Sequence, residues 1–222
     1  MTPSKIQFIS FDCYGTLINF QVGSVTRHRL HDRVPVHRMT EFLDDFTAYR
    51  FDQVLSDWKP YPDVLHGALE RTCKRWDLEY NPSDGDAIVA AVPTWEPHAD
   101  VPAPLELLAA EFPLVILSNA SDSQIPSSVE KLGAPFHAVL TAEQARAYKP
   151  RFRAFEYMFD TLGCGPECFL HVSSSLRYDL MSAHDLRIGE RVLVERGHGP
   201  ANPAYGYREI PDLGALPTLL GL

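Results

Sequence analysis

The chain has 222 residues, of which 45% are hydrophobic and 22% are charged, a composition typical of soluble globular proteins that excludes a largely disordered or fibrous chain. This length is generous for one ordinary domain, so we expect a single core that carries a sizeable insertion. With 20 basic and 29 acidic residues the formal net charge is −9, which argues against nucleic acid or a membrane surface as a partner.

The first predicted element is a strand. Residues 6–11 (IQFISF) form a short run rich in β-branched and aromatic residues, and Asp12 follows it directly. Such a run predicts a buried strand, and Gly15 predicts a tight turn after it. We therefore expect the carboxylate of Asp12 at the exposed end of a buried strand.

A helical insertion comes next. From residue 22 to 91 apolar residues recur at helical spacing with charges between them, which predicts amphipathic helices over 41–58 and 61–76 and no strand. Four prolines then crowd a dozen residues and predict a linker rather than another regular element: Pro93, Pro97, Pro102 and Pro104.

Beyond residue 104 short strands and helices alternate. The predicted strands cover 114–117, 137–140, 168–172 and 191–194, and the predicted helices cover 105–112, 124–132, 152–162 and 179–185. This alternation implies a parallel sheet with helices on both faces and right-handed crossovers. The expected fold class is α/β, with a core of residues 1–19 and 93–222 and a helical cap subdomain, residues 20–92, inserted after the first strand.

Polar residues gather where the predicted strands end. They are Asp12, Ser118, Asn119, the loop around Lys149, and residues 173–179. In an open parallel sheet, ligands bind at the carboxyl ends of the strands. These residues therefore predict the location of a functional site.

Cysteine usage and hydropathy bear on the compartment. The four cysteines, Cys13, Cys73, Cys164 and Cys168, are too few for a disulfide framework and form no zinc pattern. The spacing of Cys164 and Cys168 could suit a redox pair, but a loop followed by a buried strand explains it better. We find neither a membrane-length apolar run nor an export signal, so we expect a reducing, cytoplasmic location.

Four separated segments, taken together, resemble the haloacid dehalogenase superfamily and, within it, the L-2-haloacid dehalogenases. In chain order they are Asp12-Cys13-Tyr14-Gly15-Thr16-Leu17, Leu117-Ser118-Asn119, Tyr148-Lys149-Pro150, and His171-Val172-Ser173-Ser174-Ser175 followed by Asp179. The resemblance spans residues 6 to about 196 and implies a Rossmann-like core. It also implies a possible homodimer.

The resemblance implies a hydrolysis in two steps. Asp12 displaces halide from C2 of a small 2-haloacid with inversion, and water then attacks the resulting ester and releases the 2-hydroxyacid. Lys149 would keep Asp12 ionised, Thr16 would hydrogen-bond its carboxylate, and Asp179 would orient or deprotonate the water with Ser175 in support. An N-cap for the following helix is an alternative reading of Asp179.

Substrate contacts follow from the same resemblance. Ser118 would donate to the substrate carboxylate, Asn119 would donate to the departing halide, and Tyr14 would lie beside the substrate. In this family an arginine of the cap binds the substrate carboxylate. Arg50, on a predicted cap helix, is the candidate, because a planar guanidinium can bind a carboxylate through two hydrogen bonds. Phe155 stands where some dehalogenases have a tyrosine, and the last motif lacks the asparagine found in some of them.

Two positions favour a dehalogenase over a phosphatase. Superfamily phosphatases have a second aspartate two residues after the nucleophile as a general acid, and Tyr14 takes that place here. Metal-dependent members carry an acidic residue early in the last motif, where this chain has Ser174. We therefore expect no metal and no cofactor, because Mg²⁺ requires a cage of charged oxygens.

Several alternatives stay open. The same nucleophile in this fold serves hydrolases of fluoroacetate and of azetidine-2-carboxylate, and the sequence does not separate these from a 2-haloacid dehalogenase. A Mg²⁺-dependent phosphomonoesterase is a second alternative, and a non-catalytic ligand-binding protein of the same fold is a third.

Overall fold

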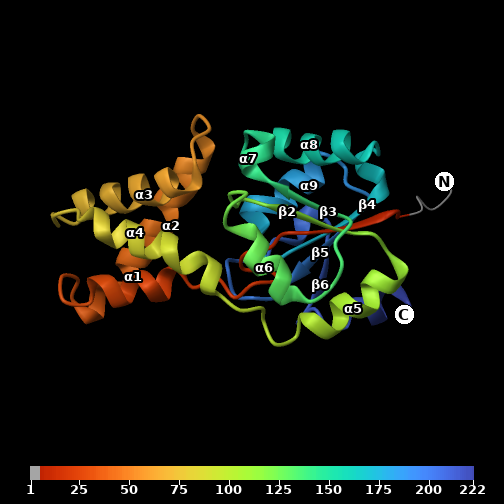
Figure 1. The fold of residues 1–222 in the computed structure, drawn as a ribbon, viewed down its shortest axis with the longest axis horizontal. Helices are drawn as coiled ribbons and strands as arrows, with labels where there is room; N and C mark the ends of the chain where they lie inside the picture. Colours follow the sequence, from red (N-terminus) through yellow and green to blue (C-terminus); the bar gives the residue numbers. More distant parts are fainter. Residues whose placement is uncertain (1–5) are drawn as a thin grey trace. The chain divides into compact units, whose positions relative to one another are not determined.

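The computed structural model describes residues 6–222 and divides into two compact units. One unit, which we call the sheet unit, consists of the described residues up to Asn19 together with Glu96–Leu222. The other, the helical unit, is Phe20–Trp95. Figure 1 shows both units along the chain.

The sheet unit is built on six strands, which are β1 (Phe8–Phe11), β2 (Leu114–Ser118), β3 (Ala138–Thr141), β4 (Phe169–Ser173), β5 (Glu190–Val194) and β6 (Arg208–Ile210). Their order is β3-β2-β1-β4-β5-β6, and every neighbouring pair is parallel. This sheet confirms the predicted α/β fold class. The strand order reverses beside β1, and in such sheets the crevice at the reversal point is where ligands bind.

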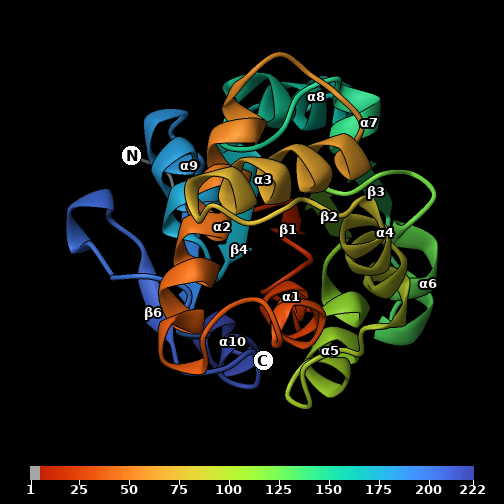
Figure 2. The same ribbon diagram turned by 90° about the vertical axis from the view of Figure 1, so that its left-hand side faces the viewer.

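Helices cover both faces of this sheet (Figures 1 and 2). On one face lie α7 (Ala142–Ala145), α8 (Phe152–Leu162) and α9 (Met181–Asp185), and on the other lie α5 (Pro102–Glu111), α6 (Ile125–Leu132) and α10 (Ala215–Leu220). Buried side chains join α8 to the sheet, among them Phe155 and Met158 against Leu117 and Phe169. Short 3₁₀ turns at Pro166–Cys168 and Pro203–Tyr205 complete the unit.

The helical unit contains four helices, which are α1 (Val22–Leu30), α2 (Met39–Leu55), α3 (Tyr61–Arg75) and α4 (Pro82–Ala91), with 3₁₀ turns at Val36–Arg38 and Val92–Thr94. Phe42 and Phe46 of α2 and Leu65 and Leu69 of α3 are fully or almost fully buried, as the predicted amphipathic pattern requires. Asn81 caps α4 by accepting a hydrogen bond from the amide of Ser83. No helix within residues 6–222 is long and apolar enough to cross a membrane.

Three details of these elements differ from the expectations. Helix α5 begins at Pro102 rather than after Pro104, because a proline at the start of a helix lacks only an N–H that would have no partner there. The helix predicted over 179–185 is present, but it begins earlier, with a π-helical turn at Leu176–Leu180 that leads into α9. Ser175 rather than Asp179 caps this segment, and its hydroxyl accepts from the amide of Tyr178.

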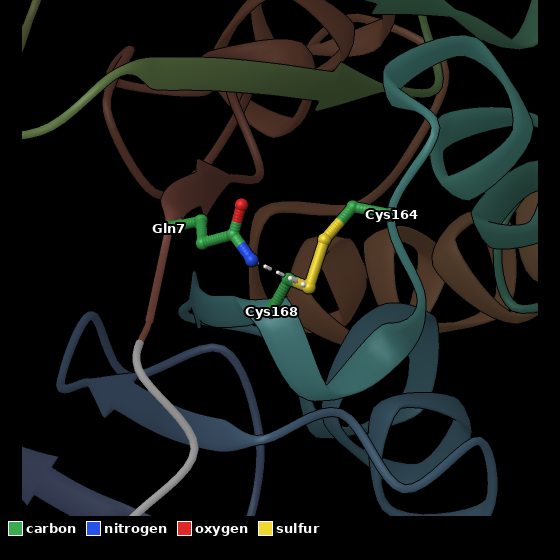
Figure 3. The surroundings of a disulfide bond; sticks show 3 residues. All are labelled: Gln7, Cys164 and Cys168. Atoms are coloured by element: carbon green, nitrogen blue, oxygen red, sulfur yellow. Dashed lines mark hydrogen bonds between the residues drawn. A yellow bond between two sulfur atoms is a disulfide. The ribbon is translucent and has the colours of Figure 1, made fainter.

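The cysteines supply a further correction. Cys164 and Cys168 form a disulfide between the end of α8 and the start of β4, with Cα atoms 6.2 Å apart, and the side chain of Gln7 donates to Cys168 Sγ at 3.3 Å (Figure 3). The prediction that a loop and a strand alone explain this spacing was therefore wrong. The expectation of a reducing compartment rested on cysteines that form no disulfide framework, and these two cysteines do not support it.

Candidate functional site

The site begins with the turn after β1. The amide of Asp12 continues the β1–β4 ladder by donating to the carbonyl of Val172 at 3.0 Å. Gly15 has a φ of +100°, a conformation that L side chains rarely adopt, and it lets the chain fold back so that the amide of Leu17 reaches the carbonyl of Cys13. The turn thus fixes the main chain on both sides of the Asp12 carboxylate.

A donor holds each oxygen of the Asp12 carboxylate. Thr16 Oγ1 donates to Oδ2 at 2.7 Å, and Lys149 Nζ donates to Oδ1 at 2.9 Å. The amide of Ser174 donates to the Thr16 hydroxyl at 2.9 Å, which directs the Thr16 proton toward Asp12. Asp12 is 8% exposed, so this carboxylate is oriented by protein groups rather than by bulk water.

Lys149 is the cation of the site, and its side chain is 1% exposed. Its ammonium donates to Asp12 Oδ1, to the carbonyl of Leu117 at 2.7 Å and to Asp179 Oδ1 at 2.7 Å. Three acceptors therefore use all three N–H groups. The side-chain amide of Asn119 also brackets the lysine main chain, with Nδ2 donating to the Lys149 carbonyl at 2.9 Å and Oδ1 accepting from its amide at 2.7 Å.

Asp179 is the second carboxylate that contacts the Lys149 ammonium. Its Oδ1 accepts from Lys149 and lies 3.0 Å from His171 Nε2, whereas its buried Oδ2 has no hydrogen-bond partner among the described residues. His171 is completely buried in β4, and its Nδ1 lies 2.9 Å from Ser10 Oγ on β1. Sequence reasoning did not select His171, although a histidine within the apolar strand FLHVS was the available signal.

The charges of these groups are coupled. Burial raises the pKa of Asp12, and although Lys149 opposes this, the nearby negative charge of Asp179 adds to it, so the net shift is upward. Burial also disfavours the charged form of Asp179, but Lys149 and the hydrogen bond from His171 outweigh it and hold the pKa of Asp179 below its ordinary value. The two carboxylates likewise outweigh burial and raise the pKa of Lys149. Lys149 therefore stays protonated, and as the pH rises Asp179 loses its proton before Asp12 does.

The serines of the site have different surroundings. Ser174 Oγ donates to the carbonyl of Gly15 at 3.0 Å and lies 3.2 Å from Thr16 Oγ1. Ser175 caps the π-turn, as described above, and its amide donates to Ser173 Oγ. Ser118, the last residue of β2, has a buried hydroxyl with no hydrogen-bond partner among residues 6–222, so its hydrogen-bonding capacity is not used by that part of the chain.

The remaining candidates lie on helices or pack against them. The hydroxyl of Tyr14 lies 2.9 Å from Ser128 Oγ on α6. In the helical unit, the guanidinium of Arg50 lies over the rings of Phe20 and Phe46 at 5.1 and 5.3 Å and donates to Thr47 Oγ1 at 3.1 Å. Its Nε is buried and has no hydrogen-bond partner in the described part of the chain. The substrate roles of Tyr14 and Arg50 stay predictions.

The chemistry of these side chains does not suit a metal ion. Within the described residues no group of three or more His, Cys, Asp and Glu side chains is placed to hold one. The third position beside Asp12 is taken by the neutral hydroxyl of Ser174, whose proton is donated to the Gly15 carbonyl. Mg²⁺ favours several charged oxygens, and Lys149 already occupies the space between the two carboxylates.

Comparisons with known proteins give related sequences. No protein-family model matches the chain. The (S)-2-haloacid dehalogenase of Pseudomonas sp. (strain YL) is 28% identical over 181 residues, which cover 77% of this chain and 75% of that protein. Haloacetate dehalogenase H-2 of Moraxella sp. (strain B) is 26% identical over 182 residues, covering 77% and 78%.

Solved structures share the fold over almost the whole chain. The L-2-haloacid dehalogenase of Xanthobacter autotrophicus with chloropropionic acid covalently bound has a TM-score of 0.77 at 22% identity and covers 97% of this chain and 98% of its own. The protein YfnB of Bacillus subtilis, bound to magnesium, has a TM-score of 0.81 at 15% identity, covering 98% and 100%. At these identities the likeness concerns the fold alone, so the side chains of the site must carry the chemical argument.

Proposed function

We propose that this chain, which belongs to the haloacid dehalogenase superfamily, is a metal-independent hydrolase that removes halide from a small (S)-2-haloacid, with Asp12 as the nucleophile. The observation that carries the proposal is the buried Lys149 ammonium, which bridges Asp12 and Asp179. A carboxylate held by a cation and a hydroxyl can attack carbon, and a halide leaving group needs no proton.

In the first step an oxygen of Asp12 attacks C2 of the substrate from the side opposite the halogen. The new C–O bond forms as the carbon–halogen bond breaks, and the electron pair of that bond leaves with the halide. The configuration at C2 is inverted. Lys149 and Thr16 keep Asp12 ionised and aligned during the attack, since both donors favour its charged form.

In the second step water attacks the carbonyl carbon of the Asp12 ester. Asp179, held ionised by Lys149, accepts a proton from this water. The intermediate collapses with cleavage of the bond between the Asp12 carbonyl carbon and the ester oxygen, and the departing alkoxide takes the proton from Asp179 to give the 2-hydroxyacid. The second proton of the water is released to solvent, which restores both carboxylates. One oxygen of Asp12 therefore departs in the product, and an oxygen of water replaces it.

The substrate is proposed to bind polar groups that have hydrogen-bonding capacity not used within the protein. The unpartnered hydroxyl of Ser118 can donate to the substrate carboxylate, and Arg50 is the proposed guanidinium for the same group. Asn119 uses one Nδ2 hydrogen on the Lys149 carbonyl, so a second hydrogen remains for the halide.

Halide release from a panel of 2-haloacids, with EDTA present throughout, tests the proposal. We expect chloride or bromide release from an (S)-2-haloacid that EDTA does not reduce, with the (R)-2-hydroxyacid as the product. A single turnover in ¹⁸O-labelled water should place the label in Asp12. Phosphate release from phosphomonoesters that EDTA abolishes would instead identify a metal-dependent phosphatase. Fluoroacetate and azetidine-2-carboxylate belong in the same panel because the site residues do not exclude them.

A further inference from the structure

A buried hydrogen-bonded chain runs from the centre of the sheet to the site. It starts at Ser10 on β1, passes through the His171 ring on β4 and ends at Asp179, with contacts of 2.9 and 3.0 Å. All three side chains are completely buried. Phe155 of α8 meets the histidine ring edge to face, with centroids 5.5 Å apart, so the imidazole has one packed orientation.

The partners of the ring determine where its proton lies. An ionised carboxylate only accepts hydrogen bonds, so Nε2 must carry a hydrogen and donate it to Asp179 Oδ1. In the neutral ring Nδ1 is then an acceptor. It lies 2.9 Å from the hydroxyl of Ser10, nearer than the carbonyl of Leu170 at 3.5 Å, so Ser10 is assigned as its donor. This arrangement fixes a single tautomer, in the way that a partner on one ring nitrogen commonly sets the role of the other.

This donor acts on one oxygen of Asp179 only. His171 and Lys149 both donate to Oδ1, so the carboxylate cannot rotate without losing two hydrogen bonds. Oδ2 is the oxygen that receives no hydrogen bond from the described residues. An unpaired buried carboxylate oxygen costs stability, so a site that leaves one has a use for it or a ligand to fill it.

We propose that His171 is a positioning residue for the hydrolysis of the Asp12 ester. Its Nε2–H holds Asp179 so that Oδ2 faces the attacking water and takes the proton from it. Ser10 holds His171 in the tautomer that makes this possible. The inference rests on the proposed function, because it assigns His171 to the second step of that reaction and gives it no part in the first.

The rival explanation is that His171 only satisfies buried polar groups within the sheet. Under that explanation its loss would weaken the fold without discriminating between the two chemical steps. Under ours, its loss misplaces the acceptor of the water proton, for which a 1 Å shift can cost about 100-fold. It also removes a hydrogen bond that lowers the pKa of Asp179. The titratable groups that face Asp179 are Lys149, Asp12 and His171.

The experiment compares His171→Phe, His171→Gln and a matched control. Phenylalanine fills the ring volume without a donor, whereas glutamine offers both an N–H and an acceptor. His184→Phe is the control, since His184 also contacts an aromatic ring, that of Tyr205, and hydrogen-bonds the Tyr205 carbonyl, but it lies outside this chain. Rapid-quench measurements with a 2-haloacid would follow the halide burst, and intact-mass spectrometry would follow the ester on Asp12.

For His171→Phe we expect a halide burst close to that of the wild type, ester hydrolysis slowed by about 100-fold, and an acid limb of that step moved to higher pH. His171→Gln should recover most of the hydrolysis rate, and His184→Phe should resemble the wild type. Nitrogen-15 NMR of the wild-type protein should show hydrogen on Nε2 and none on Nδ1 in the neutral ring, a result that does not depend on how a variant folds.

A His171→Phe protein that loses both steps equally, or that resembles His184→Phe, would overturn the role of His171 while the wild type still released halide. Hydrogen on Nδ1 alone would overturn it as well. A wild-type protein that forms no ester on Asp12 would overturn the proposed function itself, and with it any role for His171 in ester hydrolysis.

Discussion

Replacing Lys149 with methionine tests the central ion pair through stability rather than activity. Methionine keeps an unbranched side chain but removes the charge that Asp12 and Asp179 share at 2.9 and 2.7 Å. The carbonyl of Leu117 also loses its lysine donor. Two buried carboxylates then face one another without a cation between them.

The expected cost is large because the pair is buried. Removing one partner from a buried ion pair costs about 3 to 5 kcal/mol, since the other charge is left uncompensated. For a chain of this size each kcal/mol lowers the melting temperature by about 2 to 4 °C, so we expect a drop of roughly 6 to 20 °C near neutral pH.

The loss should shrink as the pH falls. Without the cation, both carboxyl groups have folded-state pKa values above those in the unfolded chain. Their contribution to stability is then fully present below the unfolded values and is lost as the pH rises through the folded ones. Acidification therefore restores part of the stability of Lys149→Met relative to the wild type.

Lys131→Met is the matched control. Lys131 Nζ lies 2.9 Å from Glu96 Oε1, the same distance as in the Lys149–Asp12 pair, but these side chains are 27% and 72% exposed. Exposed pairs contribute about 0 to 1 kcal/mol. Thermal and urea unfolding followed by circular dichroism, at neutral and mildly acidic pH, would compare the two variants. Equal losses in both, or a Lys149→Met loss that does not change with pH, would refute the reasoning.

Three other outcomes are expected from the site. Asp12→Asn should lower halide release by about 10⁴-fold or more and leave no ester detectable by mass spectrometry, and near-normal turnover would reject the nucleophile. The pKa of Asp12 is raised above its ordinary value of 3.8, and the ionised form attacks, so kcat/KM should rise with pH along an acid limb centred above 3.8. An acid limb at or below 3.8 would contradict the raised pKa of Asp12. Arg50→Ala should raise KM by about 10- to 100-fold with a smaller change in kcat, the cost of one lost charge-assisted hydrogen bond, and an unchanged KM would exclude Arg50 from substrate capture.

The central strands could be predicted because their physical signal is local. A strand buried on both faces of a parallel sheet is a short run of mainly apolar residues, and IQFISF and LVIL are such runs. Strand β6 has only three residues, Arg208–Ile210, two of them charged, and pairing with β5 defines it. What makes β6 a strand is its pairing with β5, and the periodicity of a single segment does not reveal such a pairing.

The same distinction applies to the site. Asp12, Thr16 and Lys149 were predicted from motifs, and the structure brings them together with Asp179. The role of His171 depends on its contact with Ser10, a residue of the neighbouring strand β1 that is 161 positions away in the sequence, so it was not foreseen. The disulfide likewise requires a Cα separation that residue spacing alone does not provide.

The attachment of Lys149 to the end of β2 limits where the enzyme can flex during a catalytic cycle. Its amide and carbonyl are bound to Asn119, and its ammonium to the carbonyl of Leu117. Both the main chain and the ammonium group of Lys149 are therefore hydrogen-bonded to the end of β2. We expect the loop that carries Lys149 to move together with this strand. Admitting a substrate or releasing a product must use movements elsewhere, so the positive charge is already in place when each new substrate arrives.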